Sequence, residues 1–360
     1  MYQEKRAASS FDKFRTIKPK ALRLSQEQLV TKSYLDSDTQ FPLVMQPGVE
    51  HLNLVAWTTE HRGQIEEELM RHGAILFRGF NLEGIAEFEG FVRAISPDLM
   101  NYGERSSPRS KIGDGVYTST DHPSDQHILL HNEQSYTLNW PMKLWFFCVQ
   151  PAEQQGRTPI ADSRKIFNHL DGRITEKFIE KQVMYVRNYG HGLGLPWREV
   201  FGTEDRTQVE EHCRRAEIEF EWKEGDGLRT RQVRPAVRTH PKTGEQVWFN
   251  HTVFFHISSL EAATRDSMLA VVAEDELPFN TFYGDGAPIE PSVLEEIWQA
   301  YWQETTSFPW MRGDVLMLDN MLVSHGREPF TGERHIAVAM AEPYQSQVVK
   351  SNLPHEGINR

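Results

Sequence analysis

The chain has 360 residues, a formal net charge of −12 and a pI near 5.7. This acidic balance argues against nucleic acid as the main partner. Hydrophobic residues make up 39 % and aromatic residues 11 % of the chain, which is enough for one large core and excludes extensive disorder. The length exceeds the commonest size of a single domain without requiring a second one.

Cysteine usage and hydropathy bear on location. Cys148 and Cys213 are too few to staple a chain of this size, and neither belongs to a CxxC pair, so a reducing compartment is expected. The opening residues MYQEKRAASS carry charge but no apolar segment typical of a secretory signal. No apolar run approaches membrane length. We therefore expect a soluble cytoplasmic protein without a membrane partner.

The first third predicts an arm, two helices and a strand. Residues 1–40 are polar and mixed, as in an N-terminal arm laid over the body. Apolar residues at helical spacing predict a helix over 60–71 that ends before Gly73, and a second helix over 85–95. Between them, AILFRGF (74–80) is typical of a buried strand. The stretch 102–124, rich in Ser, Gly, Pro and Arg, predicts a long loop, and such loops often border active sites.

The rest of the chain predicts mostly strands, with helices between them. Strands are expected at 127–136, 143–149, 182–190, 218–223, 313–320 and 334–340, and a hairpin at 232–238 and 246–250 around the turn HPKTG. Helices are expected at 162–170, 175–181 and 205–216, and after Pro291. No regular βαβ alternation is visible. The pattern favours a β-rich α+β fold, a barrel or double-sheet sandwich with helices packed outside.

HNEQSY (131–136) places a histidine and a glutamate two positions apart in a strand candidate. His131 and Glu133 therefore point to the same face, where they could hold a metal, share a proton or lie on a wet surface. His325 follows an apolar pair late in the chain. Two histidines and one carboxylate on a β scaffold suit non-haem Fe(II), and iron binding should weaken below about pH 6. The same set could hold zinc in a hydrolase, and a metal-free binding module is the third alternative.

An iron oxygenase also has to anchor its reductant. Arg334 lies nine positions after His325, at the start of an apolar strand. Its guanidinium could clamp a carboxylate through two parallel hydrogen bonds, which a lysine could not do as well. Thr158, in GRTP, offers a hydroxyl for the same carboxylate.

Three segments together carry a family resemblance: HNEQSY, then LWFFCVQPAEQQGRTPIADSR, then GDVLMLDNMLVSHGREPFTGERHIAVAM. They resemble the TauD/TfdA family of Fe(II)/2-oxoglutarate-dependent dioxygenases, over roughly 73–341. Within it they are most similar to the branch that contains the aspartyl hydroxylase of syringomycin biosynthesis. The resemblance implies a double-stranded β-helix, or jelly roll, with surrounding helices. It also implies Fe(II) as cofactor, with 2-oxoglutarate and O2 as co-substrates.

Matched position by position, the resemblance makes His131, Glu133 and His325 the iron ligands. Arg334 matches the arginine that binds the distal carboxylate of 2-oxoglutarate, and Thr158 its hydroxyl partner. Many relatives have Asp where this chain has Glu133. In taurine dioxygenase the arginine lies slightly farther from the last histidine, so Arg327 competes with Arg334 for the role. Halogenating members replace the carboxylate ligand with a small residue, so Glu133 argues against halogenation.

The resemblance also sets the domain and substrate hypotheses. It implies one catalytic domain over 41–345 with an inserted lid or helical region at about 163–245, and a tail over 346–360. The expected reaction is hydroxylation, desaturation or cyclisation at an unactivated C–H of an amino acid or amino-acid-derived substrate. That substrate would be free or bound to a peptidyl carrier protein, in natural-product biosynthesis. The alternative is a scavenging dioxygenase for a small sulfonate or aryloxy acid.

The residues on the substrate side are weaker candidates. Arg109 could meet a substrate carboxylate or pair with surface acids, and Tyr117 could border the same pocket. Asn250 could face the metal site or make core hydrogen bonds. Asp319 and Asn320 are expected to stabilise the turn before His325. The remaining histidines near strands are expected to be structural: His122, His127, His240, His251, His256 and His335. The oligomeric state is not indicated.

Overall fold

A seven-stranded sheet is the largest element of the fold. The computed structural model describes residues 29–100, 110–119, 122–190 and 194–346. The strand order of the sheet is β1-β2-β3-β16-β6-β19-β4, and all neighbours are antiparallel except β2 and β3. The strands are β1 Val30–Tyr34, β2 Leu43–Pro47, β3 Ala74–Phe77, β16 Val315–Asp319, β6 Asn139–Gln150, β19 His335–Gln345 and β4 Val116–Thr118.

A second, smaller sheet carries His131 and His325, two of the three predicted iron ligands. Its order is β15-β8-β17-β5, antiparallel throughout. The strands are β15 Thr305–Thr306, β8 Ile160–Asp162, β17 Val323–Arg327 and β5 Ile128–His131. A short antiparallel pair is formed by β7 Gln154–Gln155, which precedes β8, and β18 Phe330–Thr331, which follows β17. Strand β17 follows β16 after one turn, so the two sheets are joined directly before His325.

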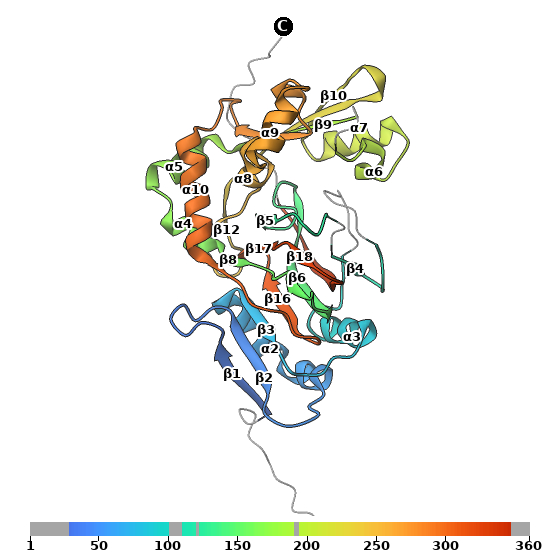
Figure 1. Cartoon of the computed structure of the whole chain (residues 1–360), viewed down its shortest axis with the longest axis vertical. Helices are drawn as coiled ribbons and strands as arrows, with labels where there is room; N and C mark the ends of the chain where they lie inside the picture. The colour runs from blue at the N-terminus through green and yellow to red at the C-terminus, as the bar shows by residue number, and fades with distance from the viewer. Residues whose placement is uncertain (1–28, 101–109, 120–121, 191–193, 347–360) are drawn as a thin grey trace, which may run out of the picture.

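Strand β6 is apolar on both faces because each face is covered. Its even-numbered residues, such as Leu144 and Phe146, belong to a core cluster with Val323, the first residue of β17. Its odd-numbered residues, such as Trp145, belong to a second cluster with the helices α2 Leu54–His72 and α3 Ile85–Ile95. Helices thus cover the outer face of the large sheet (Figure 1), and the inner face meets β17 of the small sheet.

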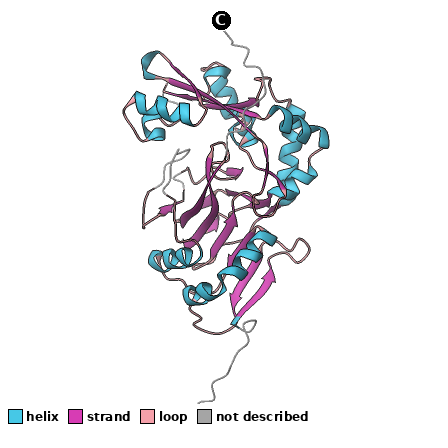
Figure 2. Cartoon of the chain, turned by 180° about the vertical axis from the view of Figure 1, so that it is seen from behind, coloured by secondary structure: helices cyan, strands magenta, loops and turns pink. Residues whose placement is uncertain are grey.

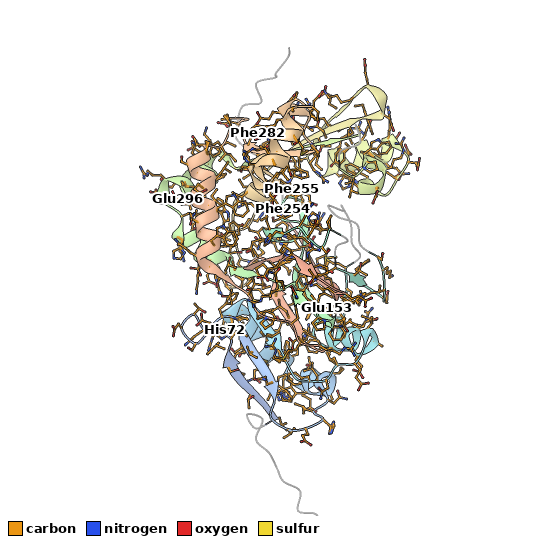
Figure 3. All side chains as sticks on the ribbon, viewed as in Figure 1. His72, Glu153, Phe254, Phe255, Phe282 and Glu296 are labelled. Carbon is orange, nitrogen blue, oxygen red and sulfur yellow. The ribbon has the colours of Figure 1, made fainter. Side chains whose placement is uncertain are left out.

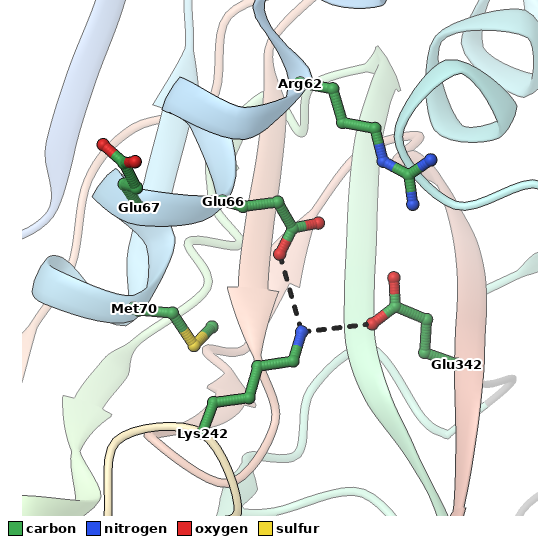
Figure 4. Close-up of a pocket in the computed structure, with 6 residues that line it drawn as sticks. All are labelled: Arg62, Glu66, Glu67, Met70, Lys242 and Glu342. Carbon is green, nitrogen blue, oxygen red and sulfur yellow. Dashed lines mark ion pairs between the residues drawn. The ribbon is translucent and has the colours of Figure 1, made fainter.

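Charged residues tie α2 to the large sheet. Lys143 of β6 is 1 % exposed, and its ammonium contacts Glu66 and, at 2.7 Å, Glu342. Lys242 lies 3.7 Å from Glu66 and 3.8 Å from Glu342, as Figure 4 shows. Paired charges satisfy the buried ammonium, which would be costly alone. The cluster explains how a lysine is accommodated in the middle of an apolar strand.

A separate lobe is built around a four-stranded sheet of order β10-β11-β9-β14, antiparallel throughout. Figures 1 and 2 show this lobe at the opposite end of the molecule from α2. Its strands are β9 Val183–Tyr189, β10 Glu219–Trp222, β11 Leu228–Arg234 and β14 Phe279–Tyr283. Its helices are α6 Trp197–Phe201, α7 Arg206–Arg215, α8 Thr252–Phe255 and α9 Ala262–Leu269, with 3-10 turns η2 Glu224–Asp226, η3 Ile257–Ser259 and η4 Glu274–Glu276.

The remaining elements flank the small sheet. They are α4 Ser163–His169, α5 Gly172–Lys181, α10 Pro291–Glu304 and the hairpin β12 Val237–Thr239 with β13 Gln246–Trp248. Among helices of the described ranges, none has both the length and the apolar composition that crossing a bilayer needs.

Most predicted elements are confirmed, including the helix 85–95 and the hairpin around HPKTG. The strand predicted at 127–136 is shorter than expected: β5 is Ile128–His131, and Glu133 lies in the turn that follows, so strand alternation does not place it beside His131. Helix α2 begins earlier than predicted, at Leu54, because the Asn53 side chain accepts a hydrogen bond from the Ala56 amide and caps it. The predicted loop 102–124 contains the short strand β4. Residues 30–34, assigned to the N-terminal arm, form β1, and β14 joins the lobe sheet from outside 163–245.

Candidate metal and co-substrate site

Two neighbouring strands bring the first and last predicted ligands together. His131 ends β5, and His325 lies directly opposite it in β17. The two imidazole centroids are 4.5 Å apart. One donor atom from each of His131, Glu133 and His325 lies within 4.8 Å of the others. The antiparallel pairing therefore joins residues that are distant in the sequence.

Gly326 allows the two strands to approach at this point. A Cβ placed on Gly326 would lie 2.5 Å from the Ile128 carbonyl oxygen, closer than a side chain tolerates. The register between β17 and β5 also shifts between His325 and Arg327. An irregularity of this kind re-aims a side chain at the edge of a functional site. Gly326, directly after His325, thus permits the close approach of the two strands that brings the histidines together.

The protonation of His131 is determined by the backbone. Its Nδ1 lies 2.8 Å from the Leu129 carbonyl oxygen, which can only accept, so Nδ1 carries the hydrogen. Nε2 is then the nitrogen through which His131 would bind a metal ion. A backbone acceptor on the second nitrogen is the usual way in which a ligating histidine is oriented.

Asn320 holds the carboxylate-bearing segment in place. The Glu133 amide donates to the Asn320 side-chain oxygen at 2.7 Å, and the Asn320 side-chain nitrogen donates to the Glu133 carbonyl at 2.9 Å. Asp319 accepts from the amides of Met321 and Leu322 at 2.9 and 3.0 Å. The predicted turn role is confirmed for Asp319, whereas Asn320 reaches across to the HNE segment.

The donor set fits a divalent iron ion. Glu133 is 3 % exposed, so its carboxylate lies inside the molecule, where an ion could be held away from solvent. Two imidazoles and one carboxylate leave open coordination positions and suit Fe(II). Donors that share an ion at roughly 2.2 Å stand at most about 4.4 Å apart, so small side-chain rotations would bring this group onto one ion.

Arg334 and Thr158 lie side by side, as predicted. The Arg334 Nε donates to the Gly156 carbonyl at 2.9 Å, and its Nη2 lies 3.4 Å from the Thr158 hydroxyl oxygen. Trp310 Nε1 donates to the same oxygen at 3.1 Å, which leaves the threonine hydrogen available for an acceptor. Burial lowers the pKa of Arg334 to about 10, with Arg327 as a second cause, so the guanidinium remains charged at neutral pH.

Arg327, the competing arginine, has a different task. Its Nη1 donates to the His122 carbonyl at 2.9 Å, and its Nη2 donates to the carbonyls of Gln126, at 2.8 Å, and Pro123. These contacts order the segment before β5. Because its donors serve backbone carbonyls, while Arg334 adjoins Thr158, the geometry favours Arg334 as the carboxylate-binding group.

The candidate substrate residues fare differently. Arg109 lies outside the described residues. Tyr117 is buried in β4 and belongs to the core cluster that contains Phe146, whose ring centroid is 5.0 Å from that of His325. Asn250 uses both ends of its amide in the core, since it donates to the Ala236 carbonyl and accepts from the Thr252 amide, each at 2.9 Å. Of the two roles expected for Asn250, it therefore has the second, which is to make hydrogen bonds in the core.

His251 borders the metal site although the sequence suggested only a structural role. Its ring stands edge-on to His131 at 5.5 Å, and Phe254 packs on His131 at 4.7 Å. Its Nδ1 is 2.6 Å from the Ser135 hydroxyl, and burial keeps its pKa well below the usual value, so it is neutral. Figure 3 labels Phe254 and Phe255 at this place. In the sequence, the signal for this position of His251 is the aromatic run FNHTVFFH (249–256), which is too apolar for an exposed loop.

Comparisons with known proteins agree with this geometry. Residues 39–340 match the model of the taurine catabolism dioxygenase TauD, TfdA family. The chain is similar to a dapdiamide synthesis protein of Enterobacter agglomerans, with 39 % identity over 84 % of this chain and 94 % of the relative. It is also similar to a clavaminate synthase-like protein of Arabidopsis thaliana, with 28 % identity over the same shares.

Solved structures with a similar fold are more distant in sequence. PvcB from Pseudomonas aeruginosa aligns with a TM-score of 0.53 and 17 % identity, over 88 % of this chain and 93 % of that one. A complex of AAD-2 with Mn(II) and N-oxalylglycine aligns with a TM-score of 0.50 and 15 % identity, over 89 % and 99 %. At these identities the likeness concerns the fold.

Proposed function

The chain belongs to the taurine catabolism dioxygenase TauD, TfdA family, and we propose on that basis that it oxidises an amino acid or an amino-acid derivative. It is a non-haem iron dioxygenase with 2-oxoglutarate and O2 as co-substrates. In the proposed reaction an unactivated C–H of the substrate is hydroxylated, desaturated or cyclised during natural-product biosynthesis. The substrate is free or tethered to a peptidyl carrier protein.

One observation carries the chemistry. His325 on β17 faces His131 at the end of β5, and one donor atom from each of these histidines and from Glu133, in the turn after β5, lies within 4.8 Å of the others. Arg334 lies beside Thr158 beyond the end of β17, which supports a carboxylate site there. A zinc hydrolase would need the donors but not the arginine and threonine, and a binding module would need neither. The substrate class is supported by the 39 % identical relative, which is named for dapdiamide synthesis.

Each side chain of the site has a definite part in the proposed mechanism. His131, Glu133 and His325 would hold the iron, and Arg334 with Thr158 would bind the distal carboxylate of 2-oxoglutarate. When bound, the iron activates O2 so that 2-oxoglutarate becomes succinate and CO2, and the second oxygen atom goes to the substrate in a hydroxylation. Phe146 and Phe254, packed on the two histidines, exclude water from this centre.

We further propose that the two sheets form a double-stranded β-helix that makes one catalytic domain over 41–345. The shared core cluster between β6 and β17 supports this arrangement. The lobe of β9, β10, β11 and β14 would then be the inserted lid. Cys148 and Cys213 are both buried thiols, which supports the proposed cytoplasmic location.

The test has two stages. Protein purified without oxygen is loaded with Fe(II) and 2-oxoglutarate, and a weak visible charge-transfer band is expected. Succinate formation is then measured with a panel of free amino acids, acylated amino acids and carrier-bound aminoacyl groups. The same panel contains taurine and aryloxy acids, because the family name leaves a scavenging role as the second candidate. No band with stoichiometric iron would contradict the iron and 2-oxoglutarate site, and stimulation by sulfonates alone would replace the proposed substrate class.

A further inference from the structure

Trp310 lies beside Thr158 at the co-substrate end of the site and has no part in the mechanism above. We propose that Trp310 is a positioning residue, which directs the hydrogen of the Thr158 hydroxyl toward the distal carboxylate of 2-oxoglutarate. The inference rests on the proposed function, because it explains how the site for that carboxylate is held ready. Trp310 acts through Thr158 and does not itself bind the carboxylate.

The Thr158 hydroxyl is buried and faces two donors. Thr158 is 2 % exposed, and its oxygen accepts from Trp310 Nε1 at 3.1 Å and lies 3.4 Å from Arg334 Nη2. A hydroxyl oxygen has two lone pairs and one hydrogen, so these two donors leave only the hydrogen unused. Among the described residues, none accepts that hydrogen. What the hydroxyl lacks is therefore an acceptor, and buried polar groups normally have one.

An ionised carboxylate would supply this acceptor. The Nε of Arg334 donates to the Gly156 carbonyl, whereas its Nη1 meets no acceptor in the part of the chain that the structure describes. Carboxylate oxygens only accept, so one carboxylate would receive hydrogens from both Arg334 and Thr158. Because the lone pairs of Thr158 are already used, a group that only donates would find no partner there. The arrangement thus selects an anion.

Hydrogen bonds to both neighbours of Trp310 fix the indole. The Arg78 Nη2 donates to the Pro309 carbonyl at 2.9 Å, and the Met311 amide donates to the Asp314 carboxylate at 2.8 Å. Arg78 and Asp314 are themselves an ion pair of 2.6 Å, and the Asp314 side chain is 1 % exposed. The segment that carries Trp310 is therefore anchored on each side, which holds the indole N–H in one direction. Such pre-organisation lowers the cost of binding.

The experiment is a double-mutant cycle on 2-oxoglutarate binding. The dissociation constant is measured from the charge-transfer band of anaerobic, Fe(II)-loaded enzyme. Trp310→Phe keeps an aromatic ring and removes the N–H, and it should raise the dissociation constant roughly three- to tenfold, as the loss of one hydrogen bond does. In a Thr158→Val background the same change should have an effect below about twofold, because the hydroxyl that Trp310 directs is gone. In a Thr158→Ser background, which keeps the hydroxyl, most of the effect should remain.

Trp302→Phe is the matched control, because Trp302 is 61 % exposed on α10, and it should leave the dissociation constant unchanged. A second measurement does not need the Trp310 variant to fold. In NMR spectra of the tryptophan indole N–H groups of the metal-free enzyme, Thr158→Val should move one signal far more than the others. That signal belongs to the indole that loses its acceptor.

Three results would overturn the positioning role: an unchanged dissociation constant in Trp310→Phe, an equal effect of this change with and without the Thr158 hydroxyl, or indole signals that all stay in place in Thr158→Val. Failure of the proposed function is seen separately, as a wild type that shows no band at any 2-oxoglutarate concentration, and the inference would then fail with it.

Discussion

Arg334 illustrates how single side chains divide the work at this site. Its Nε is held by the Gly156 carbonyl, and its outer nitrogen points to Thr158. Gly156 has φ +66°, and a Cβ there would stand 3.1 Å from the Arg334 Cδ. The side chain is thus oriented by a backbone group that only a small residue allows. The spacing from His325 indicated Arg334, but the choice over Arg327 depended on which carbonyls each one meets.

Arg334→Lys should raise KM for 2-oxoglutarate by about tenfold or more. A charge-assisted hydrogen bond contributes about 1.5–3 kcal/mol, and lysine cannot reproduce the two-pronged geometry. Steady-state kinetics with varied 2-oxoglutarate would measure the effect. Arg312→Lys, a surface arginine that donates to the Val149 carbonyl, serves as the control. An unchanged KM would remove Arg334 from the co-substrate site.

His256 makes the stability of the protein depend on pH. Burial lowers its pKa to about 4, below the usual value of 6.5. A lowered histidine pKa means that the unfolded chain binds the proton more readily, so the stability is complete above about pH 6.5 and is lost as the pH falls toward 4. At pH 5.5 the loss from this group should be about 1 kcal/mol. Denaturant unfolding at pH 7.5 and 5.5 should show it, and His256→Gln should reduce the difference.

At the scale of elements, the pairing of β5 with β17 decides whether a metal site exists. Sequence patterns predicted a strand over 127–136, of which β5 covers only Ile128–His131, and strands on either side of His325, but not β17 itself. They contained no information about which strands become neighbours. The register that sets His325 opposite His131 comes from packing of the small sheet, and Asn320 adds a cross-connection to Glu133. Strands β1, β2 and β14 were missed because they are short and weakly patterned.

Gly326→Ala should weaken iron binding strongly while leaving most of the fold intact. The added methyl group would meet the Ile128 carbonyl and push β5 away from β17, which separates the two histidines. We expect at least a tenfold rise in the dissociation constant for Fe(II), measured anaerobically by competition with a chelator. Gly63→Ala is the control, because nothing lies within 4 Å of a Cβ at that position. Equal affinity in both variants would show that the strand approach is not needed.

At the scale of the whole molecule, the candidate metal donors come from the middle and the last part of the chain. Helices α2 and α3 cover one face of the large sheet, and the lobe stands beyond the small sheet (Figure 1). The donors lie at the end of β5, in the turn that follows it and on β17. Occupying the site should therefore stabilise the molecule as a unit.

Adding Fe(II) under anaerobic conditions should raise the free energy of unfolding by about 2.7 kcal/mol when free iron is 100 times its dissociation constant. A chelator should reverse the gain, and His325→Ala should abolish it because a ligand is lost. Thermal unfolding with and without the chelator would measure this. A gain that persists in His325→Ala would indicate that iron binds elsewhere.

The sequence by itself determined the class of chemistry: the residue types in HNE, GRTP and HGREPFTGER point to two histidines, a carboxylate and an anion clamp. It also determined most helices and strands, because local periodicity and capping are properties of neighbouring residues. Only the tertiary structure decided that His325 faces His131, that Arg327 donates to backbone carbonyls, and that His251 stands beside the site. Those relations depend on strand register and on contacts between distant segments, which no local pattern encodes.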